Sequence, residues 1–235
     1  MVAMPEIAKQ VVLITGAKGG LGSSVTRACL DAGATVAGTS RSIVDADFAH
    51  PHFAAVPADL SDPAAASHLV DTVIQSLGRI DSLIHVAGGF AGGAPLHETD
   101  EATWDSMMNL NARAAFHVLR AVIPHMRKAG TGRIVAIGSR AGVQPAANIV
   151  AYSASKAALV SMVQTAALEN RDAGITANVI LPGTIDTPAN RKSDATAGGQ
   201  TWIAPERLAA LAMFLISDAA AQITGAAIPV YGAQL

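Results

Sequence analysis

Three residues near the middle of the chain, Ser139, Tyr152 and Lys156, could carry out proton transfer. Tyr152 and Lys156 stand four positions apart in a run that suits a helix, so both side chains leave the same helix face. A free tyrosine has a pKa of about 10, which makes the phenol a poor base at neutral pH. A nearby lysine ammonium favours the phenolate and lowers that pKa. Ser139 ends a predicted buried strand and could place its hydroxyl beside the phenol.

The same Tyr-x-x-x-Lys spacing is also common on exposed helix surfaces, where it has no chemical role. Proton transfer needs a pocket that holds a substrate and a partner reaction. The pair is therefore a catalytic candidate only if neighbouring strands and loops build a binding site around it.

The composition predicts one domain, over residues 1–235, that can bury a large core. Hydrophobic residues make up 51% of the chain, charged residues 14% and aromatic residues 4%. The core must therefore be mainly aliphatic, which suits helices packed on a buried parallel sheet. No apolar run is long enough to span a membrane, and the first ten residues lack the pattern of a secretory signal.

Charge and cysteine content exclude several kinds of partner. The net charge is −2 without any basic block, so neither nucleic acid nor a membrane is a predicted partner. The single cysteine, Cys29, rules out an internal disulfide and fits a reducing compartment. We therefore expect a cytoplasmic protein, and no metal site is predicted.

A glycine-rich turn, GAKGGLG from position 16, follows the first predicted strand, residues 10–15. A helical pattern continues from the turn to about residue 32. At such a junction, unpaired backbone N–H groups and the helix dipole favour a phosphate. A glycine cluster can also be a plain tight turn, but its place between the first strand and the first helix favours the pyrophosphate of a dinucleotide.

The second predicted strand, residues 35–39, ends in Ser40 and Arg41. In dinucleotide-binding sheets this strand end meets the adenosine ribose, and an acidic residue there selects NAD. Arg41 would instead bind the 2′-phosphate of NADP, and Lys18 adds positive charge nearby. NADP is therefore the favoured cofactor and NAD the alternative. Arg41 could equally be a solvated loop cation.

The third predicted strand, residues 53–59, ends in Asp59. Only about a dozen residues precede it after Arg41, which leaves no room for a full crossover helix. The Asp59 carboxylate could accept a hydrogen bond from the adenine amino group, or it could cap its own loop. Asp62 and Pro63 then predict a helix start, as N-cap and first helical residue.

The fourth predicted strand, residues 82–87, contains His85 and leads into the glycine run GGFAGG from Gly88. The glycines allow close approach to a ligand, or simply flexibility. A histidine in the middle of a buried strand is more typical of a satisfied core residue than of a catalyst. We therefore do not assign chemistry to His85.

A long helix is predicted over residues 100–128, bent or interrupted near Pro124. Asn109 and Asn111 lie in it among apolar residues. A buried amide must find hydrogen-bond partners. One of the two is therefore a candidate for holding a backbone group or a water.

Further alternation of strands and helices completes the pattern. Strands are predicted at residues 132–139, 176–181 and 226–231, with helices from the Tyr152 region to 171 and over 205–216. The chain therefore predicts an α/β, Rossmann-like, doubly wound parallel sheet of about seven strands with helices on both faces. Several strand ends converge on one crevice. Between Pro188 and Pro205 only a short loop is predicted, rather than a long helical lid, which would leave the pocket open.

Together these residues resemble the short-chain dehydrogenase/reductase family over essentially the whole chain. Tyr152 follows Ser139 by 13 residues, the usual spacing in that family. Asn111 is preferred over Asn109 because Phe116, five residues on, matches the aromatic that commonly follows the family's asparagine. The resemblance is carried by Thr15, Gly16, Gly20, Gly22, Asp59, Ala87, Gly88, Asn111, Ser139, Tyr152, Lys156, Pro182 and Gly183.

The resemblance implies a role for each catalytic residue. Tyr152 would exchange a proton with the substrate oxygen, and Lys156 would lower the tyrosine pKa and hold the nicotinamide ribose. Ser139 would hold the carbonyl, and Asn111 would anchor a water behind Lys156. Beyond Lys18, Ser40, Arg41 and Asp59, the implied cofactor contacts are Gly16, Gly20, Leu21, Gly22, Leu60, Ala87, Gly88, Tyr152, Lys156, Pro182, Gly183, Thr184, Ile185 and Thr187.

Two departures from the family pattern stand out. His85 and Val86 replace a frequent asparagine pair, which removes side-chain bonds that stiffen the sheet and the ribose pocket. The segments VAGGFAGG and DTPANRKS and the short second crossover are similar to dihydropteridine reductases. Ser40 and Arg41, in place of an acidic residue, and the Ser139 hydroxyl both argue against that subgroup.

The implied activity is NAD(P)-dependent hydride transfer between nicotinamide and a carbonyl or alcohol substrate, with Tyr152 as the general acid or base. One alternative is reduction of a pterin, and another is a non-catalytic NAD(P)-binding scaffold or sensor. The family usually assembles as dimers or tetramers through the helices that carry Asn111 and Tyr152. A homo-oligomer, such as a homotetramer, is therefore expected.

Overall fold

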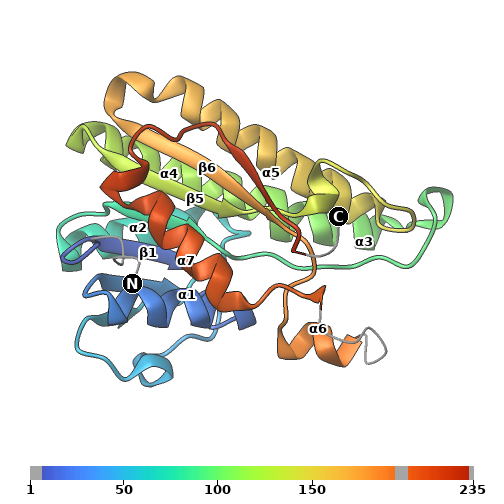
Figure 1. The fold of residues 1–235 in the computed structure, drawn as a ribbon, viewed down its shortest axis with the longest axis horizontal. Coiled ribbons are helices and arrows are strands. Elements are labelled where there is room, and N and C mark those ends of the chain that lie inside the picture. Colours follow the sequence, from blue (N-terminus) through green and yellow to red (C-terminus); the bar gives the residue numbers. More distant parts are fainter. Residues whose placement is uncertain (1–6, 194–200, 233–235) are drawn as a thin grey trace.

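The computed structural model, which describes residues 7–193 and 201–232, contains one seven-stranded parallel sheet with helices on both faces (Figure 1). The strand order is β3-β2-β1-β4-β5-β6-β7. This arrangement confirms the predicted doubly wound α/β sheet. The strands are β1 (Val11–Thr15), β2 (Thr35–Thr39), β3 (Phe53–Ala55), β4 (Ser82–His85), β5 (Gly132–Ile137), β6 (Ile175–Pro182) and β7 (Ala227–Val230).

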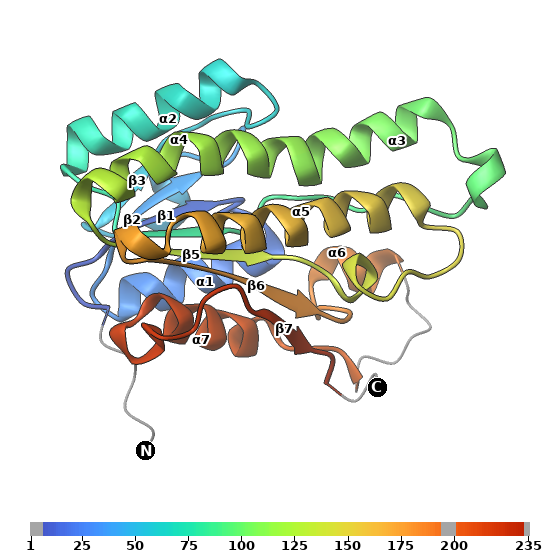
Figure 2. The same cartoon turned by 90° about the horizontal axis from the view of Figure 1, so that it is seen from above.

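Two helical layers cover the sheet, as Figure 2 shows from above. One face packs against α2 (Pro63–Leu77), α4 (Ala114–Ala129) and α5 (Val150–Glu169), and the other against α1 (Gly20–Asp31) and α7 (Pro205–Ile216). Successive strand residues point to opposite faces, so Leu13 joins the first core cluster and Val12 and Ile14 join the second. Within the described residues, every helix is too short or too polar to cross a lipid bilayer.

The connections around β2 and β3 follow from local chemistry. The crossover holds only a 3-10 turn, Asp45–Phe48, as its length requires. Asp62 caps α2 by accepting a hydrogen bond from the Ala64 N–H at 2.9 Å, and Pro63 begins the helix. These two features agree with the sequence-based expectation for this part of the sheet.

The third strand is shorter than the predicted range of residues 53–59, because β3 ends at Ala55. The N–H groups of Val56 and Ala58 still donate hydrogen bonds to the carbonyl oxygens of Gly38, in β2, and Ser40, just after β2, at 2.9 and 3.3 Å. Pro57 between them has no N–H to donate, so the regular ladder stops. Asp59 therefore lies on a loop beyond the strand end.

The long helix departs from regularity at a different place from the one predicted. After α3 (Glu101–Met107), residues Met108–Arg113 form a π-helical stretch, and α4 then runs through Pro124 to Ala129 without interruption. Pro124 and Arg120 are both exposed, so water can satisfy the Arg120 carbonyl that loses its helical donor. The π-helical stretch contains Asn111 and also Asn109 and Leu110, two residues that line the crevice described below.

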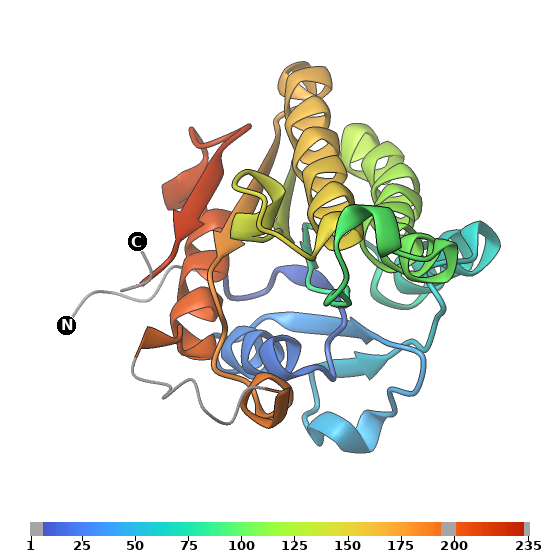
Figure 3. The same ribbon diagram turned by 90° about the vertical axis from the view of Figure 1, so that its right-hand side faces the viewer.

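The chain also differs from prediction at the carboxyl end of the sheet, which Figure 3 shows from the side where α6 lies. β4 and β5 end two residues early, at His85 and Ile137, although the next N–H groups still bond to the neighbouring strands, Val86 to Thr15 and Gly138 to Ile180. The segment between Pro188 and Pro205, predicted as a short loop, contains a short helix, α6 (Pro188–Ser193). Residues 194–200 of that loop lie outside the described part of the chain.

Candidate active site

The carboxyl ends of the strands open into a crevice of about 1580 Å³. It lies where the chain changes direction between β1 and β4, the usual ligand position in such sheets. Of the predicted site residues, Lys18, Asn111 and Thr187 lie outside its lining. The others all line it: Gly16, Gly20, Leu21, Gly22, Ser40, Arg41, Asp59, Leu60, Ala87, Gly88, Ser139, Tyr152, Lys156, Pro182, Gly183, Thr184 and Ile185.

The glycine turn between β1 and α1 accepts no side chain at two of its positions. Gly16 has φ +68°, and a Cβ there would lie 2.8 Å from the Ala87 nitrogen. A Cβ on Gly22 would lie 1.9 Å from the Gly16 oxygen, an impossible contact. Gly20 approaches Thr187 so closely that a Cβ would lie 2.9 Å from the threonine side chain. Thr187 therefore supports the turn from behind.

The start of α1 suits a phosphate group. Gly19 is the N-cap and provides no side-chain hydrogen bond, so the first backbone N–H groups of the helix face the crevice without a side-chain acceptor. This geometry, together with the glycine cradle, fits the pyrophosphate of a dinucleotide.

One end of the crevice, called the adenosine end because the sequence predicts adenosine binding there, contains Ser40, Arg41 and Asp59. The Ser40 hydroxyl is buried and has no hydrogen-bond partner among the described residues, so it fits a bound polar group. Asp59 accepts hydrogen bonds from the N–H and the hydroxyl of Ser61 at 3.0 and 2.7 Å. These bonds, and the nearby charge of Arg41, lower the pKa of Asp59. One oxygen of Asp59 therefore caps its own loop, the second of the two roles left open by the sequence.

Lys18 is near this end but is directed away from the crevice. Its ammonium lies 2.9 Å from an Asp47 carboxylate oxygen and 3.3 Å from the Ser42 carbonyl oxygen. The hydrogen bond from Lys18 holds the pKa of Asp47 below its usual value. The positive charge expected from Lys18 is thus largely balanced by a carboxylate that the sequence did not single out.

Ser139 and Tyr152 meet at another part of the crevice, called the catalytic end because the sequence predicts proton transfer by these residues. The chain leaves β5 at Ile137, and the Ser139 hydroxyl accepts a hydrogen bond from the Ala141 N–H at 3.2 Å. Ser139 also hydrogen-bonds the Tyr152 phenol. Burial raises the pKa of Tyr152, and the bond to Ser139 acts in the opposite direction. The lowering of the Tyr152 pKa by Lys156 that the sequence predicted is not found in the protein alone, where burial favours the neutral phenol.

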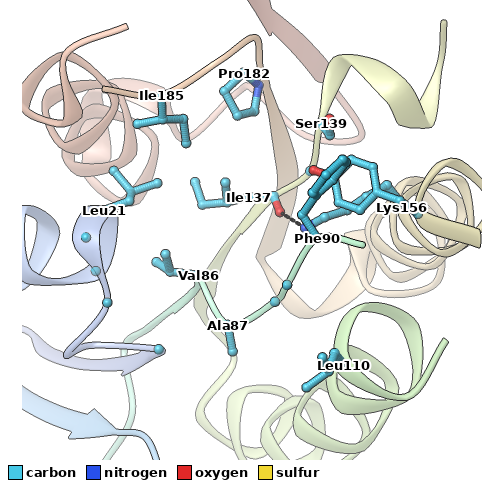
Figure 4. A pocket seen from close by; sticks show the side chains of 18 of the residues that line it. Leu21, Val86, Ala87, Phe90, Leu110, Ile137, Ser139, Lys156, Pro182 and Ile185 are labelled. Carbon is cyan, nitrogen blue, oxygen red and sulfur yellow. Dashed lines mark hydrogen bonds between the residues drawn. The ribbon is translucent and has the colours of Figure 1, made fainter. Parts of the chain in front are cut away.

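Lys156 is buried near Ser139 (Figure 4), four residues after Tyr152 in α5. Its ammonium donates a hydrogen bond to the Ile137 carbonyl oxygen at 2.9 Å. Gly88 leaves room for it, because a Cβ there would lie 3.3 Å from the lysine nitrogen. Burial lowers the pKa of Lys156 to about 8, so the side chain remains mostly protonated at neutral pH.

Asn111 lies behind the lysine and has its side chain fully engaged. Its oxygen accepts from the Gly89 N–H at 2.9 Å, and its amide donates to the Gly89 carbonyl oxygen and the Ser155 hydroxyl, both at 3.0 Å. Both amide protons are thus used. Asn111 fastens the connection after β4 to the helix that carries Lys156, whereas the unselected Asn109 lines the crevice.

His85 is buried near Lys156, a neighbourhood that the sequence did not predict. One ring nitrogen pairs with the Thr15 hydroxyl at 2.9 Å, and that hydroxyl accepts from the Ala87 N–H at 3.2 Å. These bonds stiffen the sheet at the position where the resembling family often has an asparagine pair and this chain has His85 and Val86. Burial, and secondarily the Lys156 charge, lowers the pKa of His85 to about 3, so the ring is neutral. Its other nitrogen has no hydrogen-bond partner among the described residues.

Sequence reasoning missed several residues of the substrate end. Phe90 lies against Tyr152, with ring centroids 5.0 Å apart and planes at 75°. The Arg140 guanidinium stacks over the Tyr231 ring and donates to the Gln144 side chain at 2.8 Å. The one available signal was position, since Arg140 and Gln144 follow Ser139 and Phe90 follows the glycine pair after β4.

Known proteins are similar to this chain in sequence and in fold. A model of the family described as short chain dehydrogenase matches residues 10–198. The short-chain dehydrogenase/reductase cdmF of Talaromyces verruculosus is 31% identical over 94% of each chain. The 3-oxoacyl-[acyl-carrier-protein] reductase FabG of Thermotoga maritima is 31% identical over 95% of this chain and 96% of its own.

The solved structures lead to the same family. Levodione reductase superimposes with a TM-score of 0.89 and 26% identity, covering 97% of this chain and 98% of its own. The similarity in fold and the sequence similarity both extend over nearly the full length of the chain. The chain belongs to the short-chain dehydrogenase family, whose members are oxidoreductases.

Proposed function

We propose that the protein is an NADP(H)-dependent oxidoreductase that interconverts a carbonyl compound and an alcohol. The observation that carries the proposal is the hydrogen bond between Ser139 and Tyr152, beside the buried ammonium of Lys156. These groups face a crevice whose other end has a glycine cradle suited to a dinucleotide. A proton donor next to a nicotinamide site suits reversible carbonyl reduction.

The nicotinamide, when bound, supplies or accepts the hydride at the substrate carbon. The Ser139 hydroxyl binds the substrate oxygen and orients the carbonyl toward Tyr152. Tyr152 then donates its phenolic proton to that oxygen during reduction, and takes it back during oxidation. Because burial favours the neutral phenol, Tyr152 is in the proton-donating form at neutral pH.

Lys156 acts on Tyr152 as a fixed positive charge. Its ammonium is held by the Ile137 carbonyl, so little reorganisation is needed when the phenol loses its proton. The charge stabilises the phenolate that forms during reduction. Asn111 is a positioning residue, because it ties Gly89 and Ser155 together on either side of the lysine.

NADP is the proposed cofactor, with NAD as the alternative. Arg41 at the end of β2 is exposed and can bind a 2′-phosphate, and the buried Ser40 hydroxyl can bond to the ribose or its phosphate. Pro182, Gly183, Thr184 and Ile185 line the crevice, where they would hold the carboxamide. Thr187 contributes by supporting Gly20 rather than by lining the crevice.

The test is a turnover assay with NADPH and with NADH against a broad panel of aldehydes and ketones, and also against quinonoid dihydropteridine. We expect NADPH oxidation with carbonyls and none with the pterin. Turnover of the pterin alone would favour the dihydropteridine reductase alternative. Absence of turnover with every substrate, together with NADPH binding that a Tyr152→Phe variant retains, would favour a non-catalytic scaffold or sensor.

We propose that the chain assembles as a dimer or tetramer through α4 and α5. Phe116 on α4 and Leu168 on α5 are large apolar side chains that are 47% and 62% exposed. Covering them in a subunit contact would remove apolar surface from water. Sedimentation velocity is expected to show a dimer or tetramer, and a monomer at micromolar concentration would refute the assembly.

A further inference from the structure

Phe90 is the largest exposed apolar side chain at the catalytic end of the crevice, with 66% of its surface accessible. It projects from the connection after β4 toward the region of Ser139 and Lys156 (Figure 4). Its ring touches that of Tyr152 in an edge contact, at 5.0 Å between centroids. An apolar ring is thus held against the proton donor while most of its surface remains uncovered.

The backbone around Phe90 is fixed on both sides. Gly89 is held by the two hydrogen bonds to Asn111. Gly93 donates its N–H to the Asn148 carbonyl oxygen at 2.7 Å. Gly92 packs so tightly on Ile149 that a Cβ there would lie 2.6 Å from the isoleucine side chain. The ring is therefore presented by an anchored segment, which limits the entropy lost when a ligand packs on it.

The crevice that contains Phe90 is also lined by the apolar residues Pro145, Ala146, Ile149, Ala189 and Trp202. Asp59, next to Arg41, is the one carboxylate among the described lining residues. Three of the polar side chains in the lining already have partners. Arg140 bonds Gln144 and stacks on Tyr231, and Asn190 donates to the Ile185 carbonyl oxygen at 2.8 Å.

We propose that Phe90 is a substrate-specificity residue that selects carbonyl compounds with a flat, unsaturated ring directly attached to the carbonyl carbon. The substrate oxygen would lie between Ser139 and Tyr152, and the ring would pack on the exposed surface of Phe90. This inference rests on the proposed carbonyl reduction and adds the substrate class. A contact between two aromatic rings contributes about 2- to 12-fold beyond its buried area.

The test compares acetophenone with cyclohexyl methyl ketone, which have similar size but differ in the flatness of the ring. In Phe90→Leu the apolar bulk is kept and the aromatic ring is lost. We expect kcat/KM for acetophenone to fall about 5- to 10-fold in this variant and that for the cyclohexyl ketone to change less than about 2-fold. Comparing each ketone between the two proteins cancels the difference in their intrinsic reactivity.

Leu96→Ala is the matched control, since Leu96 is 71% exposed on the same connection but lies outside the crevice lining. It should leave both ketones unchanged. Equal losses for both ketones in Phe90→Leu, or none, would overturn the inference. The inference would also be overturned if the wild-type protein reduced other carbonyl compounds but neither of these ketones. The proposed function would stand in that case.

A binding measurement separates this inference from failure of the proposed function. Saturation-transfer NMR with NADP⁺ present reports whether acetophenone binds, regardless of turnover. If the protein reduces no carbonyl at all, the proposed function fails. The Phe90 assignment then holds only if acetophenone binds wild type at least about 3-fold more tightly than Phe90→Leu, and it falls if the two bind alike.

Discussion

The catalytic and adenosine ends of the crevice each have a lysine, and the two lysines have opposite surroundings. Lys156 is fully buried, donates to the neutral carbonyl of Ile137, and has its pKa lowered to about 8. The Lys18 side chain is 43% exposed and pairs with the Asp47 carboxylate. The first charge is barely screened, whereas the second is balanced by a carboxylate and by water. Burial, rather than charge alone, should therefore decide which cation influences the proposed chemistry.

This difference predicts the size of mutational effects along the crevice. Exposed ion pairs contribute little, because solvent screens them. A buried proton-transfer group affects the reaction directly, and its loss costs orders of magnitude in rate. Changes at the catalytic end should therefore have much larger effects than changes at the adenosine end.

Tyr152→Phe should give the largest effect. It removes the proton donor and keeps the ring that packs on Phe90. We expect kcat/KM for carbonyl reduction to fall about 100- to 10,000-fold, with NADPH affinity nearly unchanged. Steady-state kinetics and fluorescence titration with NADPH measure the two quantities. A variant that retains more than a tenth of the activity would mean that Tyr152 is not the proton donor.

Lys156→Met should separate activity from stability. Activity should fall at least about 100-fold because the fixed charge beside Tyr152 is lost. The free energy of unfolding at pH 7 should rise by about 1 to 2 kcal/mol, because a buried ammonium is removed.

The pH dependence gives the sign of this effect. Below pH 8 the lysine is protonated in both states and the full cost of burying its charge is present. Between about pH 8 and its unfolded value of 10.5, the unfolded state binds more protons, so the wild type gains stability as pH rises. The advantage of Lys156→Met should therefore shrink over this window in denaturant titrations. A constant difference would contradict the lowered pKa.

The kcat/KM of the wild-type protein should depend on the same ionisation of Lys156. We expect kcat/KM for reduction to decline above about pH 8, where Lys156 loses its proton. A pH-rate profile that stays level to pH 10 would indicate that the lysine charge is not required.

His85 should produce an intermediate effect on acid stability. Its pKa is lowered from 6.5 to about 3, so the unfolded state binds a proton between these values and the folded state does not. The His85 contribution should therefore be lost as pH falls, by about 2 to 3 kcal/mol between about pH 6.5 and 4.5. Denaturant titrations of His85→Asn should show a correspondingly flatter pH dependence. The exposed His97→Asn serves as control and should match wild type.

Local signals were sufficient to predict the alternation of strands and helices and the glycine turn. The run before Gly16 is buried at every position of β1, and Gly22 admits no side chain, so sequence and structure agree there for steric reasons. The Asp62 cap was predictable because it depends only on neighbours in the chain. The crevice followed from the topology of a parallel sheet.

Contacts between distant segments were not predictable in the same way. The pairing of Lys18 with Asp47 depends on how the short crossover folds back, and the contact of His85 with Thr15 depends on strand register. The π-helical stretch around Asn111 could not be read from residue types, and Pro124 was a misleading local signal. Phe90 became a site residue only when its segment was seen to be anchored beside Tyr152.

The adenosine end should show the smallest effects, and it tests the comparison most directly. Arg41→Ala should raise the KM for NADPH about 5- to 20-fold and leave the KM for NADH within about 2-fold, because only the contact with the 2′-phosphate is lost.

Lys18→Ala should change either KM less than about 3-fold, since the Lys18 charge is already paired with Asp47. Asp47→Asn should lower the KM for NADPH slightly, about 2-fold, because it frees the Lys18 charge. Raising the salt concentration should diminish the Arg41 effect but not that of Tyr152→Phe. If Lys18→Ala weakened NADPH as much as Arg41→Ala, the lysine would have to leave Asp47 for the phosphate, and the two ends of the crevice would no longer differ in the way described.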